Sequence, residues 1–292
     1  MTATDAPAIV IARPRPRVLL IPLLTAAAFA VLFARPAYLL VRDWWTNPEA
    51  GHGLLLAPVA IWLAWRKGWV ANSRPQAALG VLILLGAVLL RAASELAAEL
   101  FTMRFSMVLA GAGLVVFYRG LRQLLAWWLP TTLLVLSIPL PELATNALAL
   151  PLQFRASRMG AALLEWRHVP VRLSGNVIDL PGRRLFVTEA CSGLRSLTAL
   201  LSLAFLMGGL WLGRVWTRIL LVALAIPIAI AINGVRVFLT GFLVYYVDPK
   251  LAEGFMHMTE GWLLFAVSMI LIGGAAGLLR FWERARRPRA AQ

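Results

Sequence analysis

The chain has 292 residues, of which 61% are hydrophobic and 14% charged, and its mean hydropathy is +0.79. Soluble domains carry about 25% charged residues, so the composition excludes a water-soluble globular protein and indicates a fold governed by the bilayer. The net charge of +15 indicates basic cytoplasmic loops rather than nucleic-acid binding, and the single cysteine excludes an internal disulfide framework and a cysteine-based metal cluster.

Apolar runs predict the membrane spans, because a spanning helix needs about 20 apolar residues. Eight runs qualify, the second and fourth of them short: 18–34, 53–65, 77–93, 104–118, 123–140, 193–212, 217–234 and 259–279. The first run resembles a signal peptide, but seven further spans favour an uncleaved helix. The expected fold class is an all-α polytopic membrane protein with one membrane domain, 18–279, between a basic N-terminus, 1–17, and a basic tail, 280–292.

Basic residues predict the orientation of these spans. With the N-terminus in the cytoplasm, the cytoplasmic segments hold 15 of the 28 lysines and arginines, but only Asp5 and Glu283 among the acidic residues. Those segments then carry a net charge of +13 and the rest of the chain +2, as the positive-inside rule requires. Both termini are therefore expected in the cytoplasm.

Residues 141–190 form the one long segment between predicted spans, and we expect them outside. They begin with PELATNALALPLQFRASRMGAALLEW, whose helically spaced apolar residues beside Arg155 and Arg158 are typical of a helix in the membrane interface. In the following VPVRLSGNVIDLPGRRLFVTEA, β-branched residues and the sequences SGN and PGR predict short strands joined by turns. The segment is expected to form a small external helix/strand cap.

The stretch EACSGLRS, residues 189–196, holds Cys191 at the outer start of the sixth predicted span. Ser192 and Gly193 suit a helix entry. A helix N-terminus lowers the pKa of a thiol and offers N–H groups to an oxyanion. Arg195 follows four residues later over the same helix face. A lone cysteine at such a position is more often structural than catalytic, so this stretch alone leaves both interpretations open.

Two further stretches hold ionisable residues at the outer ends of predicted spans. Arg236, in INGVRVF, follows Asn233 by three residues, and it either faces a polar cavity or extends to lipid phosphates. His257, in GFMHMTEGW, opens the eighth span, where it either exchanges a proton or faces water. The charge-based topology puts Cys191, Arg236 and His257 on one external face, and together they suit a nucleophile, an oxyanion donor and a proton carrier.

These blocks resemble a known family. EACSGLRSL, INGVRV and GFMHMTEG are similar to the three signature blocks of exosortases, within the exosortase/archaeosortase family. The likeness extends to GHGLLLAPVAIWLAW at 51–65, IPLPELATNALALPLQ at 138–153 and GNVIDLP before the cysteine, and it covers roughly residues 45–275. One departure is Gly234, where the family often has alanine or arginine.

The resemblance implies a cysteine protease/transpeptidase of the bacterial inner membrane, with its site facing the periplasm. Such enzymes are thought to cleave a C-terminal sorting signal of the PEP-CTERM type: a Pro-Glu-Pro motif, a transmembrane helix and a basic cluster. Family members usually accompany exopolysaccharide production. The expected partners are membrane-anchored substrate proteins, the lipid bilayer and an acceptor molecule.

The resemblance also assigns roles to residues. It puts the nucleophile on Cys191, the arginine on Arg236 and the proton-transfer residue on His257. Secondary candidates for positioning or for the thiol's environment complete the predicted site: Arg195, Asn233, His52 and Glu189. No cofactor, metal or nucleic acid is expected.

Two rival functions stay open. A thiol protease that only hydrolyses would release a free carboxylate instead of transferring the new end to an acceptor. A non-catalytic membrane subunit of exopolysaccharide export or assembly would tolerate Cys191→Ala.

Overall fold

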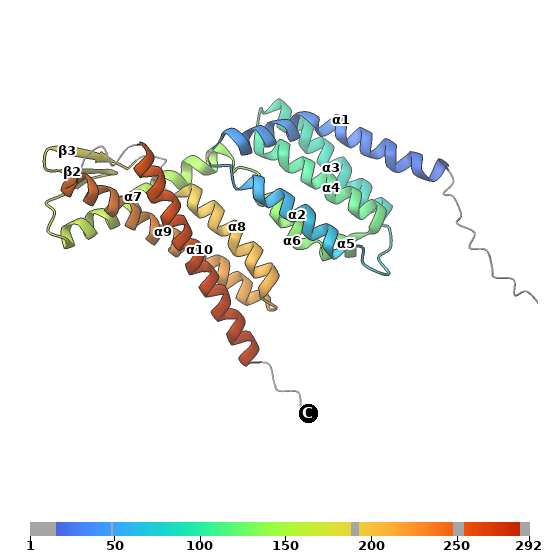
Figure 1. Cartoon of the computed structure of the whole chain (residues 1–292). Coiled ribbons are helices and arrows are strands. Elements are labelled where there is room, and N and C mark those ends of the chain that lie inside the picture. Colours follow the sequence, from blue (N-terminus) through green and yellow to red (C-terminus); the bar gives the residue numbers. More distant parts are fainter. Residues whose placement is uncertain (1–15, 48, 188–192, 248–253, 287–292) are drawn as a thin grey trace, which may run out of the picture.

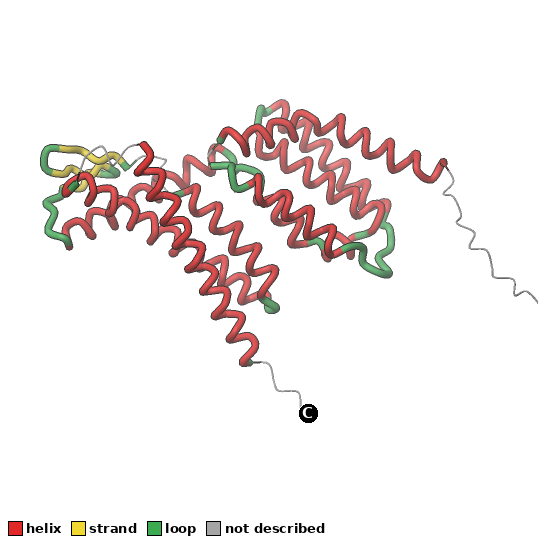
Figure 2. Tube along the Cα trace, viewed as in Figure 1, coloured by secondary structure: helices red, strands yellow, loops and turns green. Residues whose placement is uncertain are grey.

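The computed structural model describes residues 16–47, 49–187, 193–247 and 254–286, which are almost entirely helical apart from one small sheet (Figures 1 and 2). The elements follow one another in this order: α1 (Pro16–Thr46), α2 (Gly53–Lys67), α3 (Ala77–Leu96), α4 (Leu100–Arg119), α5 (Leu121–Ala126), α6 (Trp128–Leu136), α7 (Glu142–Trp166), β1 (Arg172–Ser174), β2 (Val177–Leu180), β3 (Arg183–Phe186), α8 (Leu194–Trp211), α9 (Val215–Tyr246) and α10 (Gly254–Ala285).

Six helices in the described part of the chain are long and apolar enough to cross a membrane. The qualifying stretches lie in α1, α3, α4, α8, α9 and α10: Leu20–Thr46, Ala77–Leu96, Leu100–Arg119, Leu194–Trp211, Val215–Tyr246 and Trp262–Ala285. The prediction of an all-α polytopic membrane protein is confirmed, whereas the predicted count of eight spans is not.

The predicted spans 53–65 and 123–140 form shorter helices that pack against each other. α2 has 15 residues, or about 22 Å, and the second segment is divided at Trp127 into α5 and α6. The paired helices are joined at both ends. His52 Nε2 lies 3.1 Å from the Leu136 carbonyl at one end, and Gln123 Nε2 donates to the Gly68 carbonyl at the other, 3.2 Å away.

The arginine-rich loops gather at one end of the helix stack, called here the basic end, which comprises residues 66–76, 119–122, 212–218 and 280–286. Leu121 N donates to Gln76 Oε1 across the first two of these loops, 2.9 Å away. The Arg218 guanidinium lies 4.9 Å from the Trp128 ring, which brings the third loop to α6. The basic segments thus lie at one end of the molecule, as the charge-based topology predicts. That the basic end faces the cytoplasm stays a prediction.

At the opposite end, a buried ion pair fixes α1 to α4. Arg104 of α4 is 2% exposed, and its Nη2 donates to Asp43 Oδ2 at 2.6 Å and to the Leu39 carbonyl at 3.3 Å. An ionised arginine in an apolar helix is costly unless it is paired. Asp43 therefore sets where α1 crosses α4.

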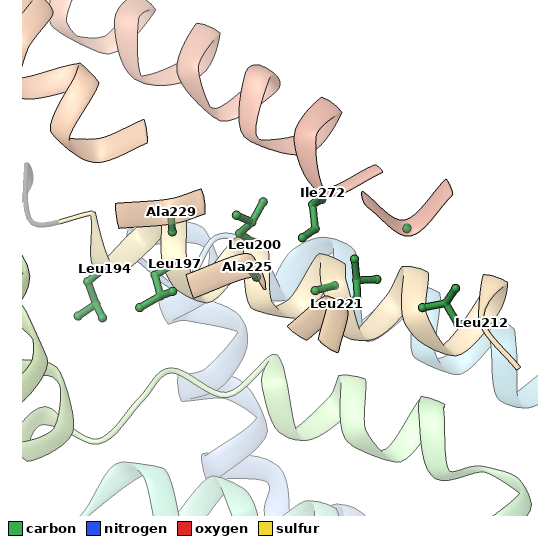
Figure 3. Close-up of a cluster of buried hydrophobic side chains, with 10 residues drawn as sticks. Leu194, Leu197, Leu200, Leu212, Leu221, Ala225, Ala229 and Ile272 are labelled. Carbon is green, nitrogen blue, oxygen red and sulfur yellow. The ribbon is translucent and has the colours of Figure 1, made fainter. Parts of the chain in front are cut away.

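α8, α9 and α10 pack around one aliphatic cluster, drawn in Figure 3: Leu194, Leu197, Leu200, Ala204, Leu212, Leu221, Ala225, Ala229, Ile272 and Ala276. The four members of this cluster on the first three turns of α8 recur every three or four residues, so they form one stripe. Between membrane helices, close packing drives association because lipid tails are as apolar as leucine.

Glu283 of α10 fixes these three helices to one another at the basic end. It is 5% exposed. Its carboxylate accepts hydrogen bonds from Gly213 N at 2.9 Å, Arg214 N at 3.0 Å and the Thr217 hydroxyl. The carboxylate thus caps the positive N-terminus of α9 and satisfies backbone donors of the turn that joins α8 to α9.

The predicted cap consists of α7 and an antiparallel sheet in the order β1-β2-β3. Its two turns fall where SGN and PGR predict them, at Gly175 and Gly182, whose φ angles are +64° and +76°. The cap rests on the second half of α9, which at 32 residues is about 48 Å long and exceeds a bilayer core of about 30 Å. Val237 of α9 is buried against residues of α7 and the sheet, among them Leu164, Ile178 and Val187.

Glu283→Ala is expected to lower the free energy of unfolding by about 2–4 kcal/mol, because it leaves the backbone N–H groups of Gly213 and Arg214 without their acceptor. Glu283→Gln keeps one acceptor oxygen and is expected to cost less. Thermal denaturation of the purified protein in detergent measures both. Glu165→Ala, at an exposed position of α7, is the control. If it lowered the stability as much as Glu283→Ala, the hydrogen bonds from Glu283 to the N-terminus of α9 would contribute nothing.

Candidate active site

The start of α8 lies directly against the side chain of Asn233 on α9. Gly193 precedes the first turn of α8 and has a φ of +78°. A Cβ atom at this position would lie only 2.7 Å from Cγ of Asn233. Glycine is required here for two reasons: the backbone is left-handed, and the Asn233 side chain leaves no room for a Cβ atom. The blocks EACSGLRSL and INGVRV, which are far apart in sequence, therefore meet where Gly193 contacts Asn233.

α9 makes an equally close approach to α7 on either side of this contact. A Cβ at Gly234 would overlap the side chain of Met159, and a Cβ at Gly160 would lie 2.5 Å from Cγ1 of Val237. Asn233 itself is 5% exposed, so its amide is enclosed between α7, α8 and α9. The overlap at Gly234 reaches back to Cβ of Met159, at 2.9 Å, so a change of the methionine's rotamer does not by itself make room for a larger residue.

Arg236 follows Asn233 by one helical turn and is partly buried. Its carbonyl accepts a hydrogen bond from the Thr240 hydroxyl at 3.0 Å, within α9. Residues three apart lie on the same side of a helix, so Arg236 shares the side of α9 that faces the start of α8. That Arg236 acts together with Cys191 stays a prediction, because Cys191 lies outside the described residues.

A polar anchor holds the end of β3 just before the segment that carries the cysteine. Asn176 Nδ2 donates to the Val187 carbonyl at 3.1 Å and to Gln153 Oε1 of α7 at 3.4 Å. Val187 N donates in return to the Asn176 carbonyl at 2.9 Å. This anchor joins the blocks at 138–153 and GNVIDLP. Neither Gln153 nor Asn176 is among the residues predicted for the site, although both are polar residues within the blocks at 138–153 and GNVIDLP.

Cys191 and Glu189 lie outside the described residues, and so does the side chain of His257. The backbone still locates their segments. Residue 192 directly precedes Gly193, and position 257 lies in the first turn of α10. With the three helices fixed by Glu283 at their other ends, a rise of 1.5 Å per residue puts Gly193, Arg236 and position 257 about 30, 33 and 39 Å away along α8, α9 and α10. The starts of α8 and α10 and the second half of α9 therefore lie toward the same end of the molecule, beside the sheet (Figure 1).

The two other secondary candidates lie apart from Asn233. Arg195 is exposed on the first turn of α8. His52 lies between two carbonyl groups, those of Glu49 and Leu136, each 3.1 Å from a ring nitrogen. Burial lowers the pKa of the His52 imidazole, and the two backbone hydrogen bonds oppose that shift. These contacts give His52 a structural task, which is to hold the start of α2 to the end of α6.

The local electrostatics suit an anionic nucleophile at the start of α8. The N-terminus of a helix carries a partial positive charge, and no acidic residue stands in the first turn of α8 to neutralise it. Arg236 adds a full positive charge from α9. Such an arrangement can stabilise a thiolate and an oxyanion. No cluster of metal-binding side chains occurs among the described residues.

Comparison with known proteins adds one match. A family model described as transmembrane exosortase, Exosortase_EpsH, matches residues 44–274. No curated protein and no solved structure matches the chain.

Gly193→Ala is expected to destabilise the protein by more than Gly182→Ala does. Both positions have φ near +77° and pay about 1–2 kcal/mol for a left-handed alanine. A Cβ at position 182 meets open space, whereas a Cβ at position 193 meets Asn233. The additional cost is expected to be about 1–3 kcal/mol, measured by thermal denaturation in detergent.

The same pair of variants tests whether the contact orders the neighbouring thiol. Gly193→Ala is expected to change the rate at which a thiol reagent modifies Cys191, because it displaces the start of α8. Gly182→Ala is expected to leave that rate unchanged. Equal stabilities and equal labelling rates in the two variants would show that Asn233 does not pack tightly on Gly193.

Proposed function

The chain belongs to the transmembrane exosortase family, and on that premise we propose that it is a membrane-embedded cysteine protease/transpeptidase. Its substrates are exported proteins that end in a PEP-CTERM sorting signal, which it cleaves at the outer face of the bacterial inner membrane. The observation that carries this proposal is the contact of Gly193 with Asn233, because it brings the cysteine block of α8 against the arginine block of α9.

In the proposed reaction, the Cys191 thiolate attacks the carbonyl carbon of the scissile peptide bond. Negative charge then develops on the carbonyl oxygen, where Arg236 and backbone N–H groups near residues 192–193 stabilise it. His257 gives its proton to the nitrogen of the leaving amine as the C–N bond breaks. The thioester that remains on Cys191 is resolved by an acceptor amine, or by water, which regenerates the thiol.

The position of the site at the starts of α8 and α10, beside the second half of α9, supports a substrate that is itself anchored in the bilayer. A peptide bond next to the transmembrane helix of a sorting signal lies at the membrane interface, at the level where these helices meet the cap. The charge partition supports cytoplasmic termini and a site facing the periplasm. The cap is then external.

Two variants of Cys191 test the nucleophile. Cys191→Ser is expected to abolish processing at normal membrane abundance, because a serine hydroxyl is almost isosteric with the thiol but far less ionised at neutral pH. Cys191→Ala is expected to be equally inactive. The size of a tagged substrate on a gel, in cells that carry each variant, reports processing.

Normal processing by the alanine variant would favour the rival function, a non-catalytic subunit of exopolysaccharide export or assembly. Normal processing by the serine variant would contradict the assignment of Cys191 as nucleophile. The mass of the processed substrate separates the remaining rival, since hydrolysis leaves a free carboxylate and transpeptidation adds the acceptor.

Arg236 and Arg195 form a matched pair that separates oxyanion stabilisation from activation of the thiol. Arg236→Ala is expected to lower the cleavage rate by about 10²–10³-fold, the usual cost of losing an oxyanion donor, while Cys191 still reacts with a thiol reagent at a nearly normal rate. Arg195→Ala is expected to slow labelling but still to cleave. Arg236→Lys is expected to rescue poorly because lysine lacks the planar two-donor fork.

Cleavage and labelling are followed in parallel on the same preparations, so a variant that misfolds is recognised by the loss of both. If the two phenotypes came out exchanged, the oxyanion role would belong to Arg195.

A further inference from the structure

A pocket of about 330 Å³ opens at the basic end, far from the candidate active site. It lies between the end of α8, the turn that follows and the last turns of α10. The charged residues that line it are Arg218, Arg280, Glu283 and Arg284, beside apolar groups such as Leu210 and Trp211. None of these residues takes part in the proposed chemistry.

The negative charge in this lining is already engaged. Both oxygens of Glu283 accept hydrogen bonds from the first residues of α9 and the turn before them, so the carboxylate neutralises a helix N-terminus. Within the residues that the structure describes, no ion pair involves Arg280 or Arg284. Three arginines therefore line a small pocket whose acidic group already accepts hydrogen bonds from the protein.

One of the three arginines is held in place by the protein. Nε and Nη2 of Arg218 donate to the Leu212 carbonyl at 2.9 and 2.8 Å, at the end of α8. The Cζ atom of Arg218 lies 4.9 Å from the centre of the Trp128 ring. A guanidinium held in this way loses little conformational entropy when an anion binds beside it. Because its Nε–Nη2 edge already binds the Leu212 carbonyl, it adds positive charge to the pocket from a fixed position.

The level of the pocket along the membrane normal indicates which source of anion suits it. Two of the membrane-crossing stretches, Leu194–Trp211 and Trp262–Ala285, end at its rim. Trp211 and Trp216, half exposed at the same level, are typical of the interfacial belt at the height of lipid headgroups. A basic pocket between helices at this height suits the headgroup of an anionic phospholipid.

We propose that the pocket lined by Arg218, Arg280 and Arg284 binds the phosphate of an anionic phospholipid headgroup, such as that of phosphatidylglycerol. Its apolar rim contacts the first carbons of the acyl chains. The inference is independent of the proposed cysteine chemistry, because it depends only on the basic end of α8, α9 and α10.

Native mass spectrometry of the full-length protein tests the site, after equilibration with phosphatidylglycerol or with phosphatidylcholine in detergent. The wild-type protein is expected to retain phosphatidylglycerol selectively. Arg280→Gln/Arg284→Gln is expected to lower that retention by about tenfold or more. Arg280→Lys/Arg284→Lys, which keeps the charge, is expected to retain more lipid than the glutamine pair. Arg122→Gln, at an exposed position of α5 on the same end, is the matched control and is expected to retain phosphatidylglycerol normally.

Thermal denaturation of the same variants separates binding from folding. Phosphatidylglycerol is expected to raise the denaturation midpoint of the wild type and of Arg122→Gln, but not that of the glutamine pair. Equal retention by the glutamine pair and the wild type would overturn the proposal. Competition by millimolar inorganic phosphate, with no preference for phosphatidylglycerol over phosphatidylcholine, would also overturn it and assign the pocket to free phosphate.

Discussion

The relative register of α8, α9 and α10 depends on the carboxylate of Glu283. Two backbone N–H groups and one hydroxyl converge on it, so sliding α10 along α8 and α9 would break these hydrogen bonds. A buried backbone donor that loses its acceptor costs about 1–3 kcal/mol. The constraint acts at the basic end, but because helices are stiff its consequence extends over their whole length. It determines which residues of α8, α9 and α10 stand level beside the cap.

Close contacts at glycines fix the relative positions of the helices at the candidate site. At Gly193 and Gly160 the backbones approach so closely that a single methyl group would collide with the neighbouring helix. Such contacts tolerate no sliding, because small residues give membrane helices their closest packing. The blocks shared with the exosortase family thus include contact points as well as candidate chemistry. Asn233 touches Gly193, and Gln153 binds Asn176 through the anchor that precedes the cysteine segment.

Histidine and arginine side chains in this chain serve two different purposes. His52 and Arg104 satisfy backbone carbonyls or a carboxylate where helices meet, which stabilises the fold because a buried polar group is costly when it lacks a partner. Arg236 lies one helical turn from Asn233, which contacts the start of α8, and Arg218, Arg280 and Arg284 line a pocket. Residue type alone does not separate these purposes. His52 was a candidate of the same standing as Asn233 until its two carbonyl partners were known.

The sequence by itself determined the membrane class, the alternation of the helices and the composition of the cap, because hydropathy, loop charge and turn residues act locally. It also indicated the blocks at Cys191, Arg236 and His257, whose signals lie in short stretches of chain. The lengths of the helices were predicted less accurately than their order. α2 and α5–α6 are shorter than spans, and α9 continues past residue 234 into the cap, because apolar runs do not show where a helix ends. Only the tertiary structure decided that Gly193 lies on Asn233, that Gln153 and Asn176 anchor Val187, and that Glu283 caps α9. Each of these contacts joins residues distant in sequence, and their geometry follows from how whole helices pack rather than from any local pattern.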